Sequence, residues 1–135
     1  MNRRDLILFF ILQILAIVWA GTVFSILQAK LAGGLAGGYF VVSGLFMLSR
    51  ARRWPKRWSS LTWYCLMLHV FAISLPMLIA RFLQIDAEFS EVRVMGIPGP
   101  VFHNISSTVF SILMLATVVD WIRATWLGSP SVTRE

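Results

Sequence analysis

The sequence predicts an all-α integral membrane protein in which four transmembrane helices form an antiparallel bundle with both termini on the cytoplasmic side (N-in/C-in). Three observations predict this class. Of the 135 residues, 58% are hydrophobic and only 13% are charged, which is far from the balance of a soluble domain. The apolar residues gather into four long runs. Most Lys and Arg side chains lie between or beyond those runs, as is typical of loops in membrane proteins.

The four apolar runs give the bounds of the predicted spans. A transmembrane helix needs about 20 predominantly apolar residues, and the runs cover about 6–27, 31–49, 61–80 and 102–122. The first run is too long for the hydrophobic region of a signal peptide, so we expect it to remain as a span. Little length is left for a soluble catalytic domain. Residues 1–135 are therefore interpreted as a single four-helix transmembrane domain.

The longest predicted connection is an outer loop over residues 82–101, which ends in the turn-rich segment 96–100. It contains acidic residues and Arg93. Its apolar residues alternate too irregularly to predict a strand. We expect either a short interfacial helix or an extended segment that covers the outer end of the bundle.

The basic residues are distributed unequally between the two sides of this bundle. One side receives nine of them, namely Arg3, Arg4, Arg50, Arg52, Arg53, Lys56, Arg57, Arg123 and Arg134, and the other receives three, namely Lys30, Arg81 and Arg93. Cytoplasmic loops carry an excess of Lys and Arg, so both termini are predicted to be cytoplasmic in a bacterial inner membrane. Trp54 and Trp58 are expected at the headgroup level. We expect this side to contact anionic lipids, and we expect no nucleic acid partner.

An inner interface is predicted where the second, third and fourth spans reach the cytoplasmic side. Its residues are Arg50, Arg52, Arg53, Lys56, Arg57, Asp120 and Arg123. Asp120 lies three residues before Arg123, so we expect a salt bridge between them.

The second span carries closely spaced glycines, which let helix backbones approach each other in lipid. Gly33, Gly37 and Gly44 fall on one helical face, and Gly34 and Gly38 fall on the adjacent strip. Two interpretations remain open. The glycines close the bundle internally, or they seat a second copy of the chain or a partner membrane protein on the second helix.

His69 is the titratable group that the sequence places at mid-membrane, with Cys65 one turn before it. Intramembrane ionisable residues are candidates for function. A haem would need a second histidine at equal depth, whereas His103 is predicted at the outer boundary, so we expect no cofactor and no metal. A hydrogen bond to a serine, to Gln13 or to a backbone carbonyl is the expected role. Pro76 predicts a kink near the outer end of the same span.

An outer polar cluster is predicted from Arg81, Arg93, His103 and Asn104, which end or begin consecutive elements at the outer side. The structural interpretation makes Asn104 the N-cap of the fourth helix. The functional interpretation brings the cationic side chains together as a pocket for an anionic headgroup or carboxylate.

The sequence contains no recognisable catalytic motif, so we expect a protein that is not an enzyme. The favoured hypothesis is a small polytopic inner-membrane subunit or accessory protein that acts through helix packing with itself or a partner. One alternative is an oligomeric transporter of a small solute or ion. The other is an electron-transfer or lipid-processing component that uses His69 or His103.

Overall fold

The computed structural model of the chain describes residues 2–126, so Arg134 of the predicted cytoplasmic group lies outside the described residues. Four helical spans are long and apolar enough to cross a membrane. They are α1 (Arg3–Ile26), α2 (Ala29–Ala51), a composite third span, and α5 (Gly99–Trp126). The third span joins α3 (Leu61–Met67), the π-helix η2 (Leu68–Ser74) and α4 (Leu75–Leu83). This confirms the all-α class and the four long apolar helices.

The helices extend beyond the predicted spans at most ends, because polar residues at the helix ends continue the helical turns. Asn2 caps α1 by accepting from the amide of Arg4 at 3.1 Å. Between α1 and α2 only Leu27 and Gln28 are non-helical. Because α4 continues to Leu83 and α5 begins at Gly99, the outer loop is shorter than predicted, and its non-helical part covers residues 84–98.

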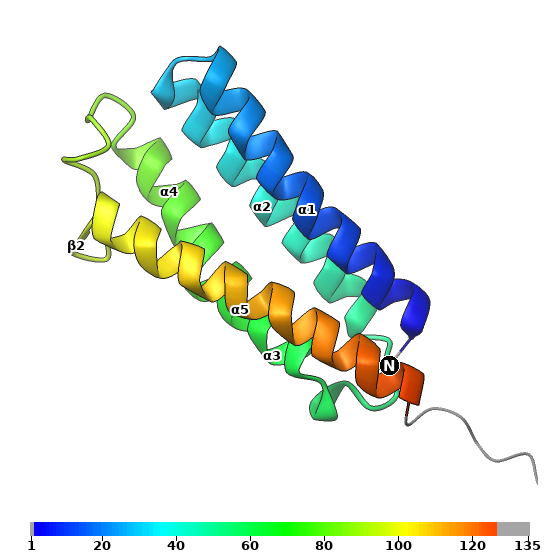
Figure 1. Ribbon diagram of the computed structural model, residues 1–135. Coiled ribbons are helices and arrows are strands. Elements are labelled where there is room, and N and C mark those ends of the chain that lie inside the picture. Colours follow the sequence, from blue (N-terminus) through cyan, green and yellow to red (C-terminus); the bar gives the residue numbers. More distant parts are fainter. Residues whose placement is uncertain (1, 127–135) are drawn as a thin grey trace, which may run out of the picture.

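The helices form two hairpins (Figure 1). In one, α1 packs beside α2; in the other, the third span packs beside α5. We call the end of the bundle that holds Arg3, residues 52–60 and Trp126 the inner end, after the predicted orientation. The opposite end, capped by residues 84–98, is called the outer end. In Figure 1, α1 and α5 lie together at the inner end and separate toward the outer end, whereas α2 stays in contact with α4.

The buried core follows this shape. At the inner end one cluster draws residues from all four spans, comprising Leu6, Phe9, Met47, Leu48, Ala51, Trp54, Trp63, Leu66, Val70 and Leu113. Toward the outer end the core divides into separate clusters. Val23 packs with Ala32 and Ala36 between α1 and α2, whereas Ile73, Ala80, Val92, Val94 and Phe102 join the third span, the loop and α5.

The outer loop packs over the outer end of the bundle, as one of the two expectations had it, and it contains a small β-hairpin that neither expectation included. Strand β1 (Arg93–Val94) pairs antiparallel with β2 (Ile97–Pro98). Between them Met95 and Gly96 have φ angles of 51° and 82°, and two positive φ values are the signature of the tight turn that suits a two-residue hairpin loop. The alternation rule missed the pairing because each strand is only two residues long.

Candidate functional site

The interior polar site centres on His69, which is 3% exposed and lies within the π-helix η2. Its Nε2 atom is hydrogen-bonded to Ser74 Oγ at 3.0 Å, so one of the expected partners, a serine, is confirmed. The ring packs against Phe40 of α2 and Phe110 of α5, with centroids 6.0 Å and 5.3 Å away. Its Nδ1 atom is buried without a hydrogen-bond partner among residues 2–126.

The π-helix is the local reason that this pair forms. Residues five apart share a face when the backbone bonds run from i to i+5, as they do in a π-helix. His69 and Ser74 have this spacing. Pro76 follows directly in the first turn of α4. The structure has π-helical turns before Pro76, with Ser74 bonded to a side chain, and the kink expected at Pro76 stays a prediction.

A second interior pair joins the first and fourth spans. Gln13 Nε2 donates to Thr117 Oγ1 at 3.0 Å, and both residues are buried. Thr117 Oγ1 in turn donates to the carbonyl of Leu113 at 2.9 Å. Gln13 is thus taken by α5 and is not a partner of His69.

At the inner end an ion pair that the sequence did not predict joins α1 to α2. Arg50 Nη2 lies 2.7 Å from Asp5 Oδ1, and Trp54 Nε1 donates to Asp5 Oδ2 at 2.9 Å. Asp5 is buried, and the ring of Trp54 also stacks on Phe9 with centroids 5.5 Å apart. Trp54 is 3% exposed, so its ring packs inside the inner end of the bundle, and its expected depth at the headgroup level stays a prediction. The sequence feature that could have predicted this ion pair is Asp5 itself, a single acidic residue in the first turn of an apolar helix.

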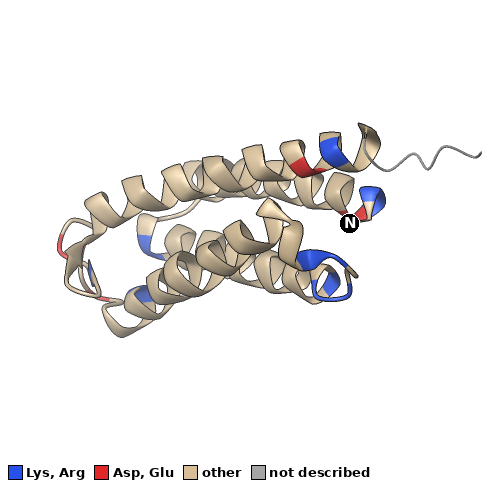
Figure 2. Ribbon diagram, turned by 90° about the horizontal axis from the view of Figure 1, so that it is seen from below, with Lys and Arg blue, Asp and Glu red and all other residues tan. Residues whose placement is uncertain are grey.

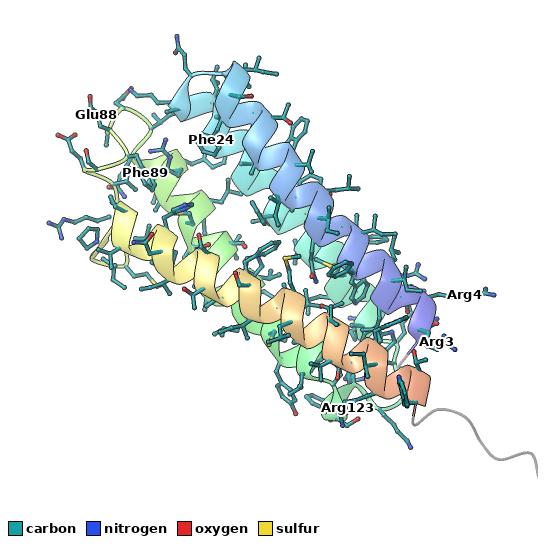
Figure 3. The ribbon with its side chains drawn as sticks, in the orientation of Figure 1. Arg3, Arg4, Phe24, Glu88, Phe89 and Arg123 are labelled. Carbon is teal, nitrogen blue, oxygen red and sulfur yellow. The ribbon has the colours of Figure 1, made fainter. Side chains whose placement is uncertain are left out.

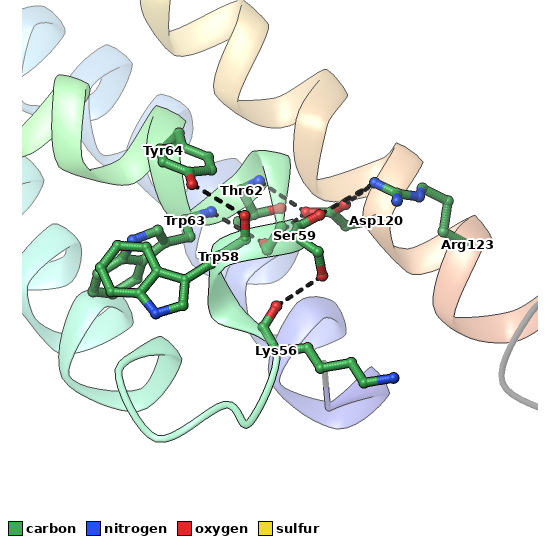
Figure 4. A network of polar contacts seen from close by, with 9 residues as sticks. Lys56, Trp58, Ser59, Thr62, Trp63, Tyr64, Asp120 and Arg123 are labelled. Carbon is green, nitrogen blue, oxygen red and sulfur yellow. Dashed lines mark hydrogen bonds and ion pairs between the residues drawn. The ribbon is translucent and has the colours of Figure 1, made fainter.

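Asp120 fills a second buried position at the inner end (Figure 4). The predicted contact with Arg123 exists at 3.4 Å. The shorter contacts are different, because Asp120 Oδ2 accepts from Ser60 Oγ at 2.7 Å and from the amide of Thr62 at 2.8 Å. Ser60 Oγ in turn accepts from the amide of Trp63. Asp120 therefore caps the N-terminus of α3, where free amides and the helix dipole favour a negative charge.

The other basic residues of the predicted inner interface lie between the end of α2 and the start of α3. Arg52, Arg53 and Lys56 are exposed. The guanidinium of Arg57 lies over the ring of Trp58, with its carbon 4.7 Å from the ring centroid.

At the outer end the structure brings only part of the predicted cluster together. The guanidinium carbon of Arg81 lies 5.8 Å from the ring centroid of Phe89, and His103 packs edge-on to the same ring at 6.0 Å. Phe89, labelled in Figure 3, comes from the outer loop. Arg81 and His103 thus lie at the same level of the bundle, as predicted. Both pack on the ring of Phe89, which the prediction did not include. Arg81 Nη1 is buried and has no hydrogen-bond partner among the described residues.

Arg93 and Asn104 do not join this cluster. Arg93 donates through its side chain to the carbonyl of Gly96 at 3.2 Å, since it belongs to the hairpin. Asn104 is exposed and lies inside α5, whose first residue is Gly99. Its predicted role as N-cap is wrong, because Pro100 suits the first turn of a helix and the chain turns into the helix at Gly99, whose amide donates to Val92.

The two glycine strips of α2 have different surroundings. A Cβ added at Gly33 would lie 3.2 Å from Arg81 Nε, at Gly37 it would lie 3.1 Å from Leu78 Cδ1, and at Gly44 it would lie 2.5 Å from Val70 Cγ2. This strip therefore packs on the third span inside the bundle. A Cβ at Gly34 or Gly38 would meet no atom within 4 Å.

The geometry defines an all-helical protein with four helices long and apolar enough to span a membrane and with buried polar contacts between them. Within residues 2–126, no three His, Cys, Asp or Glu side chains gather as a metal site. His69 and His103 contact different aromatic groups. No protein-family model, curated protein or solved structure matches the chain.

Proposed function

We propose that this chain is a small, non-catalytic, multi-pass protein of the bacterial cytoplasmic membrane that acts through helix packing with a second copy of itself. Its proposed orientation places both termini and the inner end in the cytoplasm. The charged residues support insertion, because they gather at the two ends of the bundle and leave an apolar middle (Figure 2). A bilayer core tolerates such a middle and penalises charges within it.

The observation that supports the packing role is that buried polar side chains form contacts between different spans. Gln13 binds Thr117 across α1 and α5, Asp5 binds Arg50 across α1 and α2, and Asp120 binds Ser60 and the amide of Thr62 across α5 and α3. Each of these contacts joins two spans. Polar groups that bridge helices in this way stabilise helix association in lipid.

The open glycine strip, defined as Gly34 and Gly38, supplies the surface for a second copy. These residues are four apart on the face of α2 beside the internally packed strip, and nothing lies within 4 Å of their Cβ positions. Small residues at this spacing allow two helices to cross closely in a bilayer. The same strip on two copies satisfies the self-complementarity that a two-fold dimer requires.

Cysteine crosslinking in native membranes tests self-association. In a Cys65→Ser background, Gly34→Cys and Gly38→Cys should each give an oxidised dimer, because a disulfide needs Cα atoms about 4.4–6.8 Å apart. Leu115→Cys is the matched control, since Leu115 is 63% exposed on α5. Monomers in all three variants would contradict the proposal, and an adduct with a different protein would replace the second copy by a partner subunit.

A blocking variant gives an independent readout. Gly38→Leu should reduce the dimer fraction, because its side chain would occupy the space for the second helix. Gly21→Leu is the control, since Gly21 also has open space around its Cβ position but lies on α1. Equal loss of dimer in both variants would argue against a specific contact at Gly38.

The π-helix supports a second candidate function, an oligomeric transporter of a small solute or ion. Irregular π-helical turns occur frequently at functional sites, and η2 holds His69 with its Nδ1 atom unpartnered among residues 2–126. Proton flux into dye-loaded proteoliposomes provides a first test. A proton flux that His69→Phe abolishes would favour the transporter. A flux equal to that of protein-free vesicles would contradict a proton-transport function.

A further inference from the structure

An apolar groove lies between α1 and α5 at the inner half of the bundle. It has a volume of about 290 Å³ and is lined by Leu6, Ile7, Phe10, Ile11, Thr117, Val118 and Trp121. Thr117 is the polar member of this lining. Its hydroxyl is already engaged with Gln13 and with the carbonyl of Leu113, so the groove presents an apolar surface.

The sequence spacing puts a cationic residue, Arg3, on the helical face of α1 that lines this groove, one turn before its inner end. Arg3 precedes Ile7 by four residues and Phe10 by seven in α1, and residues at these spacings share one helical face. Helical side chains also lean toward the N-terminus, which directs Arg3 past the end of the groove. Arg3 and Arg4 are exposed at the same end of the bundle as Arg123 (Figure 3).

The local charge at the inner end of the groove is positive. The nearest acidic residue in sequence is Asp5, and its carboxylate is taken by Arg50 and Trp54 on the α2 side. Asp120 of α5 is taken by Ser60, Thr62 and Arg123. Neither carboxylate is therefore free to neutralise Arg3.

We propose that the α1–α5 groove binds one acyl chain of an anionic phospholipid whose phosphate contacts Arg3. The inference rests on the proposed membrane insertion with the inner end cytoplasmic. In a bilayer the chain gains no hydrophobic transfer energy, because lipid tails are as apolar as the groove. Selectivity comes from the headgroup, since anionic lipids are attracted to basic residues at the cytoplasmic surface. The acyl chain adds van der Waals contacts with the groove surface, which would otherwise lack neighbouring atoms.

Photolabelling with a phosphatidylglycerol that carries a diazirine on its acyl chain tests the proposal. The protein is reconstituted in phosphatidylcholine, and labelled peptides are identified by mass spectrometry. Labels should concentrate on Ile7, Phe10, Val118 and Trp121, and unlabelled phosphatidylglycerol should compete. The same diazirine on a phosphatidylcholine should label these positions less.

Two matched pairs of variants test the headgroup and the groove separately. Arg3→Gln should lower labelling about fivefold, the change for one basic residue near an anionic membrane surface, whereas Arg53→Gln, an exposed basic residue after α2 and outside the lining, should leave it close to the parent value. Val118→Phe should lower labelling by filling the groove, whereas Leu115→Phe, on an exposed part of α5 outside the lining, should not.

Equal labelling by the two lipids, or labelling unchanged in Arg3→Gln and Val118→Phe, would overturn the site and leave only bulk lipid around the bundle. A protein adduct from a photoreactive residue placed at Val118 would mean that another helix fills the groove, which would also overturn it. Extraction of each variant at alkaline pH tests insertion separately. Release of the parent protein from the membrane would contradict the proposed function itself, whereas failure of the groove with an unextracted protein would contradict only the lipid site.

Discussion

At the scale of single residues, the two buried carboxylates of the inner end have different partners. Asp5 is paired with a guanidinium and an indole N–H. Asp120 receives a hydroxyl and a backbone amide at shorter distances than its guanidinium contact. The first joins α1 to α2, and the second joins α5 to the start of α3. Both contacts therefore fix where helices begin or meet at this end of the bundle.

We expect Asp120→Ala to lower the free energy of unfolding by about 1–3 kcal/mol, because Ser60 Oγ and the amide of Thr62 would lose a buried acceptor. Asp120→Asn should cost less, since an amide oxygen still accepts and the contact with the half-exposed Arg123 contributes little. Denaturation in detergent micelles measures both. If the two variants lose equal stability, charge rather than capping is the main contribution of Asp120.

Gly44 is the tightest of the inward-facing glycines of α2. We expect Gly44→Ala to destabilise the bundle by about 1–3 kcal/mol, because the added methyl group overpacks against Val70, whose Cγ2 would lie 2.5 Å from it. Gly34→Ala is the control, since its Cβ position is open. The midpoint of thermal unfolding reports the difference. Combining Gly44→Ala with Val70→Ala should recover part of the loss, and a Gly44→Ala variant as stable as the control would refute close packing there.

Anion binding at Arg81 stays a prediction. Its Nη1 atom has no partner among the described residues, and Phe89 covers one face of the guanidinium. If an anionic headgroup or carboxylate binds there, Arg81→Gln should reduce ligand retention, and each loss of about 1.4 kcal/mol in binding free energy corresponds to a tenfold reduction. Arg81→Lys should reduce retention less, because the charge remains without the planar fork.

Native mass spectrometry with phosphatidylglycerol or acetate as the probe measures this retention. Arg93→Gln is the matched control at the same end, since its side chain is bonded to the carbonyl of Gly96. Retention that is the same for the parent, both Arg81 variants and the control would remove the anion pocket.

At the scale of elements, the third span differs from the others by its π-helix. Seven residues, Leu68–Ser74, adopt this form between two α-helical segments. The π-helix aligns His69 with Ser74, and Pro76 then lies in the first turn of α4, where a proline is tolerated because that turn needs no donor amide from it. The irregular segment thus has a side-chain contact of its own and is part of the packed interior.

A double-mutant cycle tests this contact. Ser74→Ala should cost about 1–3 kcal/mol, because His69 would lose its hydrogen-bond partner in a buried position. The double variant His69→Phe with Ser74→Ala should cost less than the sum of the two single variants, since neither polar group is then left unpaired. Unfolding in a denaturing detergent series gives the three values. Strict additivity would show that the hydrogen bond contributes no stability.

At the scale of the whole molecule, the four spans share one core only at the inner end. Toward the outer end, α1 and α2 pack on each other through small residues, and the loop packs on α5 and the third span. The basic residues follow the same division, because residues 50–57 and both described chain ends lie at the inner end.

This distribution predicts the orientation of the molecule. In a Cys65→Ser background, Ser90→Cys should react with a membrane-impermeant maleimide on intact cells, and Ser59→Cys should react only after permeabilisation, because basic loops remain cytoplasmic. Both serines are exposed, so accessibility within the protein is matched. The opposite labelling pattern would reverse the proposed topology.

The sequence was sufficient for features that depend on local composition. The lengths of the apolar runs predicted four long helices, and basic residues marked their ends, because a span needs about 20 apolar residues whatever its neighbours are. The spacing of Gly33, Gly37 and Gly44 predicted a common face, since helical periodicity is a local property. The Asp120–Arg123 contact followed from the same periodicity.

Only the tertiary structure decided which faces and side chains meet. It turned Gly33, Gly37 and Gly44 toward the third span and left Gly34 open, a choice that spacing alone does not make. It also joined Asp5 to Arg50, although the two are 45 residues apart. These contacts depend on the rotation and depth of each helix against its neighbours. The physical reason is that lipid and protein interior are equally apolar. Hydrophobicity therefore determines which segments form the long apolar helices, but not which helix faces pack together.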